Sequence, residues 1–514
     1  MRPARLVAKR GDFSCEYEYT RCAWGYRYED DLTGASLYDE RGKQSMGIDS
    51  SVDAFGQEIK PYEICEGQIG KIRRLVYENA SSRQMCTEMA GRGVLPVIVG
   101  GDLFVYSMCR MFFESYRIKP LVLIAEDVKI VTTTKFAEIM YVKGTDDEPT
   151  LLGALKSVAD AVSDRDCALY VMGTGDWYAR TFSKNAELLR SWGYTTPYCD
   201  YGLFDSITQK GVFQGICDEL EIAHPATYTL PCDKSVDAVD PLACPFSYPV
   251  IAKPSNSAAW HYVEFDGKAK IMTVGTPEEL SHIYAELRES CYDKDLLVQD
   301  MIPGFDESLY SITCFAWQGN VEFSVLGHVL LQDHAPSAIG NPVVIVGDTE
   351  MPDWKVKLLD DAKRFLEHVG YTGFANFDVM YDSRDDTYKF LEVNARLGRN
   401  SWYLDIAGID LPKVIMDHWI APSAKSGGKA SQTYGVTGEP QHAVRSFSFK
   451  MVPDSVIRKY AADCPDREYA LSDRADESPV LCREDSIAHR FWGFVTNMNQ
   501  IRKFRRFVGD APRR

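Results

Sequence analysis

The chain has 514 residues, 45% hydrophobic and 25% charged, which is the composition of a soluble globular protein with several domains. Its 74 acidic residues outnumber its 57 basic ones, and the net charge of −17 excludes a general nucleic-acid or polyanion binder. The 14 cysteines form no CxxC pair and show no zinc-site spacing, so we expect reduced thiols and a cytoplasmic protein. No apolar run approaches the ~20 residues of a membrane span, so we expect no transmembrane segment.

Residues 1–90 are polar and show no sustained period of 2 or 3.6, so we predict a poorly structured N-terminal extension. After it, a buried strand, a glycine turn and a helix follow one another twice. The turns are GGD at 100–102 and GTGD at 173–176. This repetition predicts a Rossmann-like α/β domain over residues 91–205. The turns either only permit a tight strand-to-helix connection or form a backbone nest for a substrate carboxylate.

Two lysines stand out in the next part of the chain. Lys210 lies in a predicted helix, and Lys253 ends a short apolar strand just before a polar loop at 255–260. A lysine is seldom placed in an apolar strand without a partner, and a phosphate would be a suitable one. Further on, the strand at 296–302 breaks at Pro303 and Gly304. Its apolar residues could flank a flat base, and Asp306 or Glu307 could accept ribose hydroxyls. A core strand with a surface turn is the alternative.

Two further strands, at 374–381 and 390–396, are separated by a turn-rich polar stretch and predict a hairpin. Residues two apart in a strand face the same side, so Glu392, Asn394 and Arg396 line one surface, with Asp378 beside them on the partner strand. Two carboxylates and an amide oxygen suit Mg²⁺, with Mn²⁺ as an alternative ion, and the arginine suits a phosphate. A solvated hairpin with a polar wet face is the other interpretation.

The C-terminal region, residues 424–514, begins with a Gly/Ser-rich linker and is predicted to be mainly helical. Its last part, residues 492–507, is basic and aromatic on an otherwise acidic chain. This stretch is either a helix packed by its aromatic residues with a solvated basic face, or a segment that contacts an anionic substrate or a membrane surface.

The order of these features over about residues 93–419 resembles the ATP-grasp fold. The resemblance implies an α/β (α+β) protein with a Rossmann-like pre-ATP-grasp domain at 91–205, an ATP-grasp domain at 206–423 and a C-terminal helical extension. It also implies ATP and Mg²⁺ as cofactors, with Asp378, Glu392 and Asn394 holding the metal. The residues that the resemblance assigns to ATP are Lys210, Lys253, Ser255 and Ser257 for the phosphates, Gln299, Asp300, Met301 and Ile302 for the adenine, and Glu307 for the ribose.

Within this superfamily, several motifs are similar to carboxylate-amine ligases of the D-aspartate ligase type. They are PVIVGGD at 96–102, KPSNS at 253–257 with Trp260, GNP at 340–342, EVNARLGR at 392–399 and QIRKFRR at 500–506. The resemblance implies an amino-acid carboxylate and an amine acceptor as substrates, the acceptor being the lysine of a cell-wall precursor peptide in that type.

Such a reaction needs cations placed in advance, because ATP phosphorylates the carboxylate through a transition state with spread negative charge. Lys253 and Arg396 are our candidates beside the metal. Arg399 is the candidate clamp for a carboxylate of the acid substrate, with a structural salt bridge as its alternative. Two other functions stay open: a ligase that makes a free dipeptide or other small amide, and an ATP-binding regulatory module without turnover. Both lysines and the full metal set argue against the last.

Overall fold

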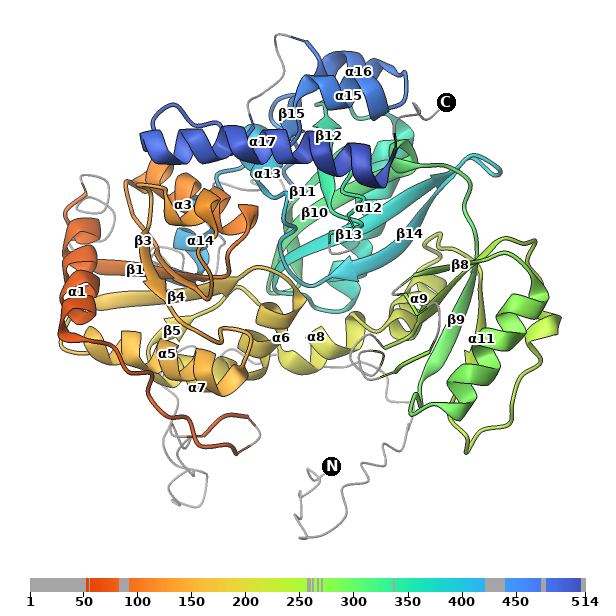
Figure 1. Cartoon of the computed structure of the whole chain (residues 1–514), viewed down its shortest axis with the longest axis horizontal. Helices are drawn as coiled ribbons and strands as arrows, with labels where there is room; N and C mark the ends of the chain where they lie inside the picture. Colours follow the sequence, from red (N-terminus) through yellow and green to blue (C-terminus); the bar gives the residue numbers. More distant parts are fainter. Residues whose placement is uncertain are drawn as a thin grey trace. The chain divides into compact units, whose positions relative to one another are not determined.

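The structure is a computed structural model, and the residues it describes fall within one compact unit, 49–514. They are residues 52–54, 56–82, 92–256, 260, 263–265, 268–269, 271–335, 338–420, 440–472 and 478–509. Three sheets organise this part of the chain (Figure 1).

The first sheet is parallel, in the order β3-β2-β1-β4-β5, and is covered by helices on both faces. Alternate residues of the central strand enter different cores: Val94 and Ile98 pack with α3, while Leu95 and Val97 pack with α5. The predicted Rossmann-like domain is therefore present. Its elements are β1 (Gly93–Val99), α3 (Leu103–Tyr116), β2 (Leu121–Ile124), α4 (Lys129–Thr132), β3 (Glu138–Tyr141), α5 (Glu148–Ala161), β4 (Cys167–Gly173), α6 (Asp176–Lys184), α7 (Ala186–Ser191) and β5 (Tyr194–Thr195).

A helix that we did not predict, α1 (Glu66–Ala80), packs against this sheet. It buries Ile72, Leu75 and Val76, and its Asn79 side chain bonds the backbone of Val94 and Lys119. The prediction of a poorly structured stretch over 1–90 is therefore wrong for the helix at residues 66–80. The apolar stripe of α1 is narrow and the rest of the helix is polar. The helical period of 3.6 residues is therefore weak in the sequence. Residues 1–51 and 83–91 lie outside the described residues.

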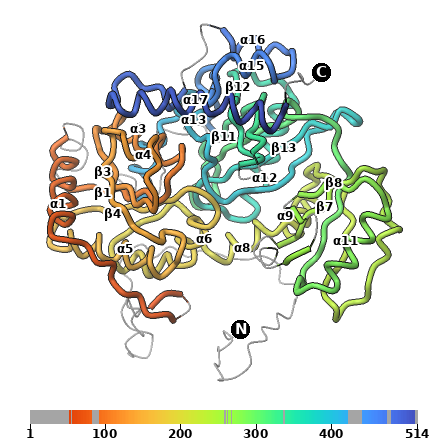
Figure 2. Tube along the Cα trace, viewed as in Figure 1, coloured from red at the N-terminus to blue at the C-terminus, as the bar shows by residue number. Residues whose placement is uncertain are grey.

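The second sheet is antiparallel, in the order β6-β9-β7-β8, and the helix α11 packs on it. Figure 2 shows the chain leaving the first domain through α8 and reaching this sheet through α9. The elements are α8 (Tyr201–Ile207), α9 (Lys210–Glu219), β6 (Thr227–Pro231), η1 (Pro241–Ala243), β7 (Val250–Pro254), β8 (Met272–Val274), α11 (Pro277–Glu289) and β9 (Asp295–Asp300).

The third sheet has six antiparallel strands in the order β14-β13-β10-β11-β12-β15. The helix α12 covers one face through Leu358, Ala362 and Phe365, which share a core with the strands. The elements are η2 (Asp306–Ser308), β10 (Leu309–Trp317), β11 (Asn320–Gln332), β12 (Pro342–Gly347), α12 (Asp353–His368), β13 (Gly373–Asp382), β14 (Thr387–Asn394) and β15 (Phe447–Lys450).

The C-terminal region contains the predicted helices and one strand that we did not expect. β15 pairs with β12, so part of residues 424–514 completes the third sheet. A four-residue strand is too short to show a period of 2, which explains the omission. The helices from residue 402 onward are α13 (Trp402–Ile406), α14 (Leu411–Ile415), the π-helical turn η3 (Met416–Ile420), α15 (Asp454–Tyr460), α16 (Pro465–Ala470) and α17 (Ile487–Phe507). No helix in the described ranges is long and apolar enough to cross a bilayer.

The long helix α17 is tied to the rest of the protein at both ends (Figure 1). Just before it, the buried Asp485 accepts hydrogen bonds from Tyr106 Oη (3.1 Å), Thr134 Oγ1 (2.6 Å) and the backbone N of residue 135 (2.8 Å). Near its other end, Lys503 pairs with Asp333, which follows β11. α17 therefore joins the first domain to the third sheet.

Candidate active site

The predicted hairpin is confirmed as β13 and β14, and it brings the proposed metal ligands together. Asp378 lies opposite Glu392 in the strand register, and Asn376 lies opposite Asn394. The Asn394 Nδ2 donates to Asp378 Oδ2 at 3.1 Å. One short segment of chain therefore supplies two carboxylates and two amides on one face.

Asn376, which we did not predict as a site residue, holds Asp378 from behind. Its Nδ2 donates to Asp378 Oδ1 at 3.2 Å, and its own Oδ1 accepts from Ser311 Oγ (3.0 Å) and Thr313 Oγ1 (2.8 Å). Asn376 is buried, so these bonds fix its amide orientation. Because the two hydroxyls come from β10, the sequence of the hairpin alone could not reveal this support.

The electrostatics of this face suit a cation. Burial, and then the adjacent Glu392 carboxylate, raise the pKa of Asp378 to about 7, against the opposing effect of Arg396. Two carboxylates held side by side repel each other, and a divalent cation between them relieves that repulsion. The donor set of carboxylate and amide oxygens fits Mg²⁺. The residues present therefore fit the predicted metal.

Both predicted phosphate-binding lysines are buried, and one lies beside the hairpin. Lys210, the first residue of α9, places its Nζ 3.8 Å from Glu392 Oε2. Lys253 lies in β7, opposite Leu297 of β9. The Ser255 hydroxyl accepts a hydrogen bond from the backbone N of Asp295 at 3.1 Å, which anchors the start of the following loop. Ser257 lies outside the described residues.

The predicted adenine-binding segment is the end of β9 and the residues after it. Gln299 is buried and donates to Thr227 Oγ1 at 3.0 Å, and Ile302 is buried, while Met301 is half-buried. The carboxylate of Asp300 pairs with Arg384 at 2.8 Å. The side chain of Asp300 is therefore already engaged, and its backbone N also donates to the Ala226 carbonyl at 3.1 Å.

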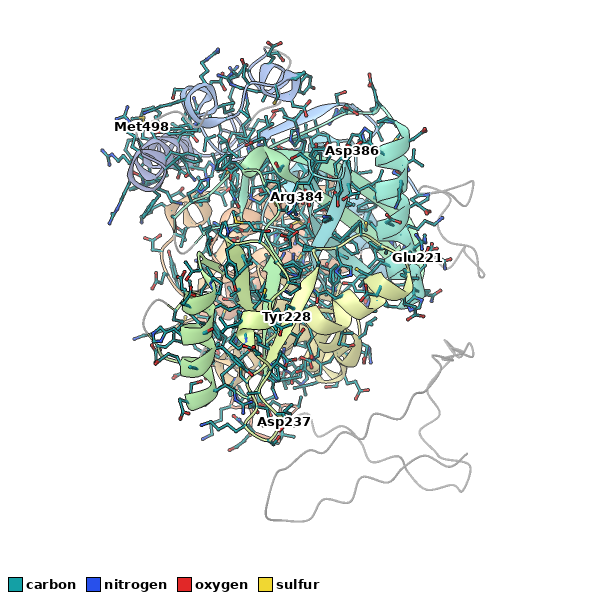
Figure 3. The ribbon with its side chains drawn as sticks, turned by 90° about the vertical axis from the view of Figure 1, so that its right-hand side faces the viewer. Glu221, Tyr228, Asp237, Arg384, Asp386 and Met498 are labelled. Atoms are coloured by element: carbon teal, nitrogen blue, oxygen red, sulfur yellow. The ribbon has the colours of Figure 1, made fainter. Side chains whose placement is uncertain are left out.

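Arg384, labelled in Figure 3, joins two sheets at this point. Its Nη2 contacts Asp300 of β9 at 2.8 Å and Asp382 of β13 at 2.7 Å. Glu307, the predicted ribose contact, lies in η2, and its carbonyl accepts from His328 Nε2 at 2.7 Å. The neighbouring Asp306 is buried and accepts from Gln332 and His334, so Glu307 is the more available of the two acids that the sequence offered for ribose.

Arg396 lies just beyond β14 and is held by the first domain. Its Nε contacts Asp176 Oδ1 at 2.8 Å, and its Nη2 donates to Asn394 Oδ1 at 3.1 Å. Asp176 is the first residue of α6 and the last residue of the second glycine turn. This turn therefore reaches the hairpin of β13 and β14 from another domain.

Arg399 makes the corresponding contact with the first glycine turn. Its Nε lies 3.0 Å from Asp102 Oδ2, and Thr174 Oγ1 of the second turn donates to the same oxygen at 2.7 Å. The turns touch because Gly100 has a φ of +124° and an added Cβ would lie 2.2 Å from Thr174 Cγ2. The contact with Asp102 is the salt bridge that we had held as the alternative for Arg399, and the substrate role stays a prediction.

A small cavity lies beside Arg399, and the sequence did not predict its lining. It has a volume of about 40 Å³ and is lined by Leu103, Asp333, Asn341, Asn400 and Gln500 among others. Within the described part of the chain, the Nδ2 of the buried Asn400 and the Oε1 of Gln500 have no hydrogen-bond partner. An unpaired donor and an unpaired acceptor around one cavity suit a small polar group that carries both functions.

Comparison with known proteins agrees with this geometry. Residues 340–418 match the family model described as carbamoyl-phosphate synthase L chain, ATP binding domain. The D-aspartate ligase of Enterococcus faecium (strain Aus0004) is 30% identical over 432 residues, covering 82% of this chain and 99% of that protein.

Solved structures with weaker similarity include the biotin carboxylase domain of Hydrogenobacter thermophilus 2-oxoglutarate carboxylase, in complex with MgADP, ADP and bicarbonate. It is 16% identical, with a TM-score of 0.47, over 65% of this chain and 70% of that one. The L-amino acid ligase from Bacillus licheniformis is 15% identical, with a TM-score of 0.43, over 63% of this chain and 73% of that one.

The matched family model and the full-length relative show that the chain is an ATP-grasp enzyme, an ATP-dependent carboxylate-amine ligase. The chain belongs to the family of the D-aspartate ligase within this class. The predicted enzyme class is thereby confirmed, and the match to an ATP binding domain agrees with ATP as a cofactor. Mg²⁺ stays a prediction. The individual site residues stay predictions, and the geometry above is the basis for proposing their roles.

Proposed function

We propose that this ligase joins a carboxylate of a small dicarboxylic amino acid, with D-aspartate as the leading choice, to the side-chain amine of a lysine-containing cell-wall precursor peptide. The relative whose full length the chain matches is a D-aspartate ligase. The observation that carries the proposal is the convergence of Arg396 and Arg399 on the two glycine turns, directly after the metal-binding strand. An acid bound there would lie beside the phosphates of ATP.

The hairpin face and the two lysines would hold ATP and the metal. Asp378, Glu392 and Asn394 would bind Mg²⁺, while Lys210 and Lys253 would contact phosphates. When bound, ATP with Mg²⁺ supplies the phosphoryl group that converts the carboxylate into an acyl phosphate, which the amine then attacks. The task of the chain is to place cations around the developing charge before the reaction begins, which is where most of the stabilisation of such transition states arises.

The second carboxylate of the acid would bind at Arg399. This side chain is 43% exposed, compared with 17% for Arg396, so it can exchange Asp102 for a substrate. The unpaired amides of Asn400 and Gln500 lie around the adjoining cavity and complete a set of donor and acceptor groups for an amino acid. In a closed site that excludes water around Arg399, an arginine without an anion is costly, so we expect a dicarboxylate to be preferred over a neutral amide by roughly 2 to 4 kcal/mol.

The test compares ADP release with D-aspartate, L-aspartate, D-asparagine and D-alanine, each with a lysine-containing acceptor peptide. D-Aspartate should exceed D-asparagine in kcat/KM by roughly 30-fold or more, the lower limit of that energy. Mass spectrometry of the peptide product then locates the new amide bond. If D-alanine or D-asparagine reacts as fast as D-aspartate, the enzyme does not prefer a dicarboxylic acid. Arg399 then does not bind a second carboxylate of the substrate. A free dipeptide as the product would rule out the cell-wall acceptor and leave the ligase chemistry intact.

A further inference from the structure

The helix α17 presents a line of large apolar side chains to solvent. Ile487, Phe491, Phe494 and Met498 are 85%, 59%, 60% and 41% exposed. At about 100° per residue these four positions fall within about 60° of one another, so they form a single stripe along the helix. Figure 3 places Met498 on the outer side of α17. Single exposed apolar residues are ordinary, but an aligned row of four marks an interaction surface.

The fold uses a different face of the same helix. His489, Gly493 and Phe504 are buried, and an added Cβ on Gly493 would lie 2.5 Å from the carbonyl oxygen of Val480. These residues fall on the side of the helix away from the stripe. Packing against the rest of the protein therefore accounts for one apolar face of α17 and leaves the stripe unexplained.

Charge distinguishes this surface from the rest of the molecule. α17 contains no acidic residue, although the whole chain has a net charge of −17. The cations of the helix are Arg490, Arg502, Lys503, Arg505 and Arg506. At the same angular spacing Arg505 continues the line of the stripe, while Arg490 and Arg502 flank it on opposite sides. A partner for this surface therefore combines an apolar layer with negative charge.

A basic cavity lies next to the stripe, on the side of Arg490. It has a volume of about 510 Å³, within the range of small-ligand sites. Its lining includes the cations Lys450, Arg483 and Arg490, against the single carboxylate of Asp454. This size and charge suit a phosphate-bearing headgroup. The cavity and the stripe share α17, so one ligand surface could occupy both.

We infer that α17 binds an anionic lipid surface, with the stripe entering the apolar layer and lipid phosphates contacting the flanking arginines and the basic cavity. A helix of this kind lies in the interface and does not cross the membrane. A free phosphate would explain the cations but not the stripe. A second copy of this chain would explain the stripe, but a two-fold contact would bring the same cations together. The inference does not depend on which acid or amine the enzyme uses.

The experiment is sedimentation of the full chain with vesicles of phosphatidylcholine alone or mixed with phosphatidylglycerol, at low and high salt. We expect binding to the anionic vesicles, weakened by salt. The double variant Phe491→Ser with Phe494→Ser should bind at least about tenfold more weakly, because it removes apolar area from the stripe. The pair Arg483→Gln with Arg490→Gln should lose the preference for anionic vesicles. The matched control is Tyr77→Ser with Leu242→Ser, which changes two exposed apolar residues elsewhere and should bind as wild type.

Two further measurements separate the other outcomes. ADP release in solution should be unchanged in the stripe variant, which shows that it folds and that the ligase site does not depend on the membrane. Light scattering should show the same mass for wild type and stripe variant. Failure of the wild type to bind anionic vesicles, or equal binding by the stripe variant, would overturn the inference. If the wild type is an oligomer and the stripe variant is a monomer, the stripe is instead a contact with a second copy of the chain.

Discussion

The hairpin face and the arginine pair lie next to each other but differ in how their charges are balanced. On the hairpin, Asp378 and Glu392 are neighbouring acidic residues. The Nζ of Lys210 lies 3.8 Å from Glu392 Oε2, which is longer than a hydrogen bond. The two arginines each already contact a carboxylate, Asp176 at 2.8 Å and Asp102 at 3.0 Å. One region gains by binding a cation, while the other must exchange partners to bind an anion.

This difference has consequences for how each region responds to mutation and to ligands. Removing a charge from the hairpin should weaken the proposed metal site directly, because its carboxylates supply the negative charge that binds the cation. Removing the aspartate that contacts an arginine can have two effects. A buried arginine should lose its orientation, whereas an exposed arginine should become more available to bind the substrate. Four measurements test these expectations, beginning with the largest effect.

Glu392→Gln should give the largest loss of activity. The substitution keeps the shape of the side chain and removes one charge from the metal site, so turnover should fall by at least ~100-fold if the ion stabilises several kcal/mol of developing charge. Steady-state ADP release at several Mg²⁺ concentrations measures the effect. Glu350→Gln, an exposed position after β12, is the control. An unchanged rate in a folded Glu392→Gln protein would end the interpretation of the hairpin as a metal site.

In the absence of metal, the free energy of unfolding should depend on pH, because Asp378 is buried beside Glu392. The pKa of Asp378 is raised in the folded protein from 3.8 to about 7, so its stabilising effect is complete below about pH 4 and is lost as the pH rises through about 7. In EDTA, the wild type should therefore lose roughly 1 to 3 kcal/mol between these limits relative to Asp378→Asn.

Thermal unfolding of both proteins across this pH range measures the difference. Asp386→Asn, at the turn of the same hairpin, is the control and should follow the wild type. Its φ of +55° is tolerated by asparagine. Parallel curves for wild type and Asp378→Asn would show that burial and the neighbouring Glu392 do not raise the pKa of Asp378 in the folded protein.

Asp176→Asn tests the more buried of the two arginines. Arg396 is only 17% exposed, so we expect Asp176 to orient it, and its loss should lower kcat by about tenfold with little change in the KM for the acid. Asp166→Asn is a matched control, because Asp166 pairs with Arg92 through the same atoms at 2.9 Å on an exposed surface of the same domain. A lower KM with an unchanged kcat would mean that Asp176 acts by competition and not by orientation.

The same contrast explains how far the sequence could lead. The hairpin was predictable because its ligands lie within one short segment, where the period of 2 determines which side chains share a face. Three other features join segments that are far apart in the chain. They are the pairing of Arg396 with Asp176, the bonds from β10 that fix Asn376 beside Asp378, and the position of Gln500 at the cavity beside Arg399. No local pattern encodes these contacts. The glycine turns were visible, but their meeting with the arginines depends on how the first domain packs against the third sheet.

Asp102→Asn should have the smallest effect, and in the opposite direction. Asp102 holds Arg399 through one contact, and that arginine is 43% exposed, so the pair is worth about 0 to 1 kcal/mol. The asparagine oxygen can still cap α3, and its amide nitrogen can donate to the Thr174 hydroxyl, but the side chain no longer competes as an anion for Arg399. The KM for the acid should therefore fall by about threefold while kcat is unchanged, because 1 kcal/mol corresponds to about fivefold at most.

Initial rates over a range of D-aspartate concentrations measure this change in KM. D-Alanine, which lacks the second carboxylate, should show no such gain. A higher KM for D-aspartate would mean that Asp102 orients Arg399, so that both arginines work in the same way.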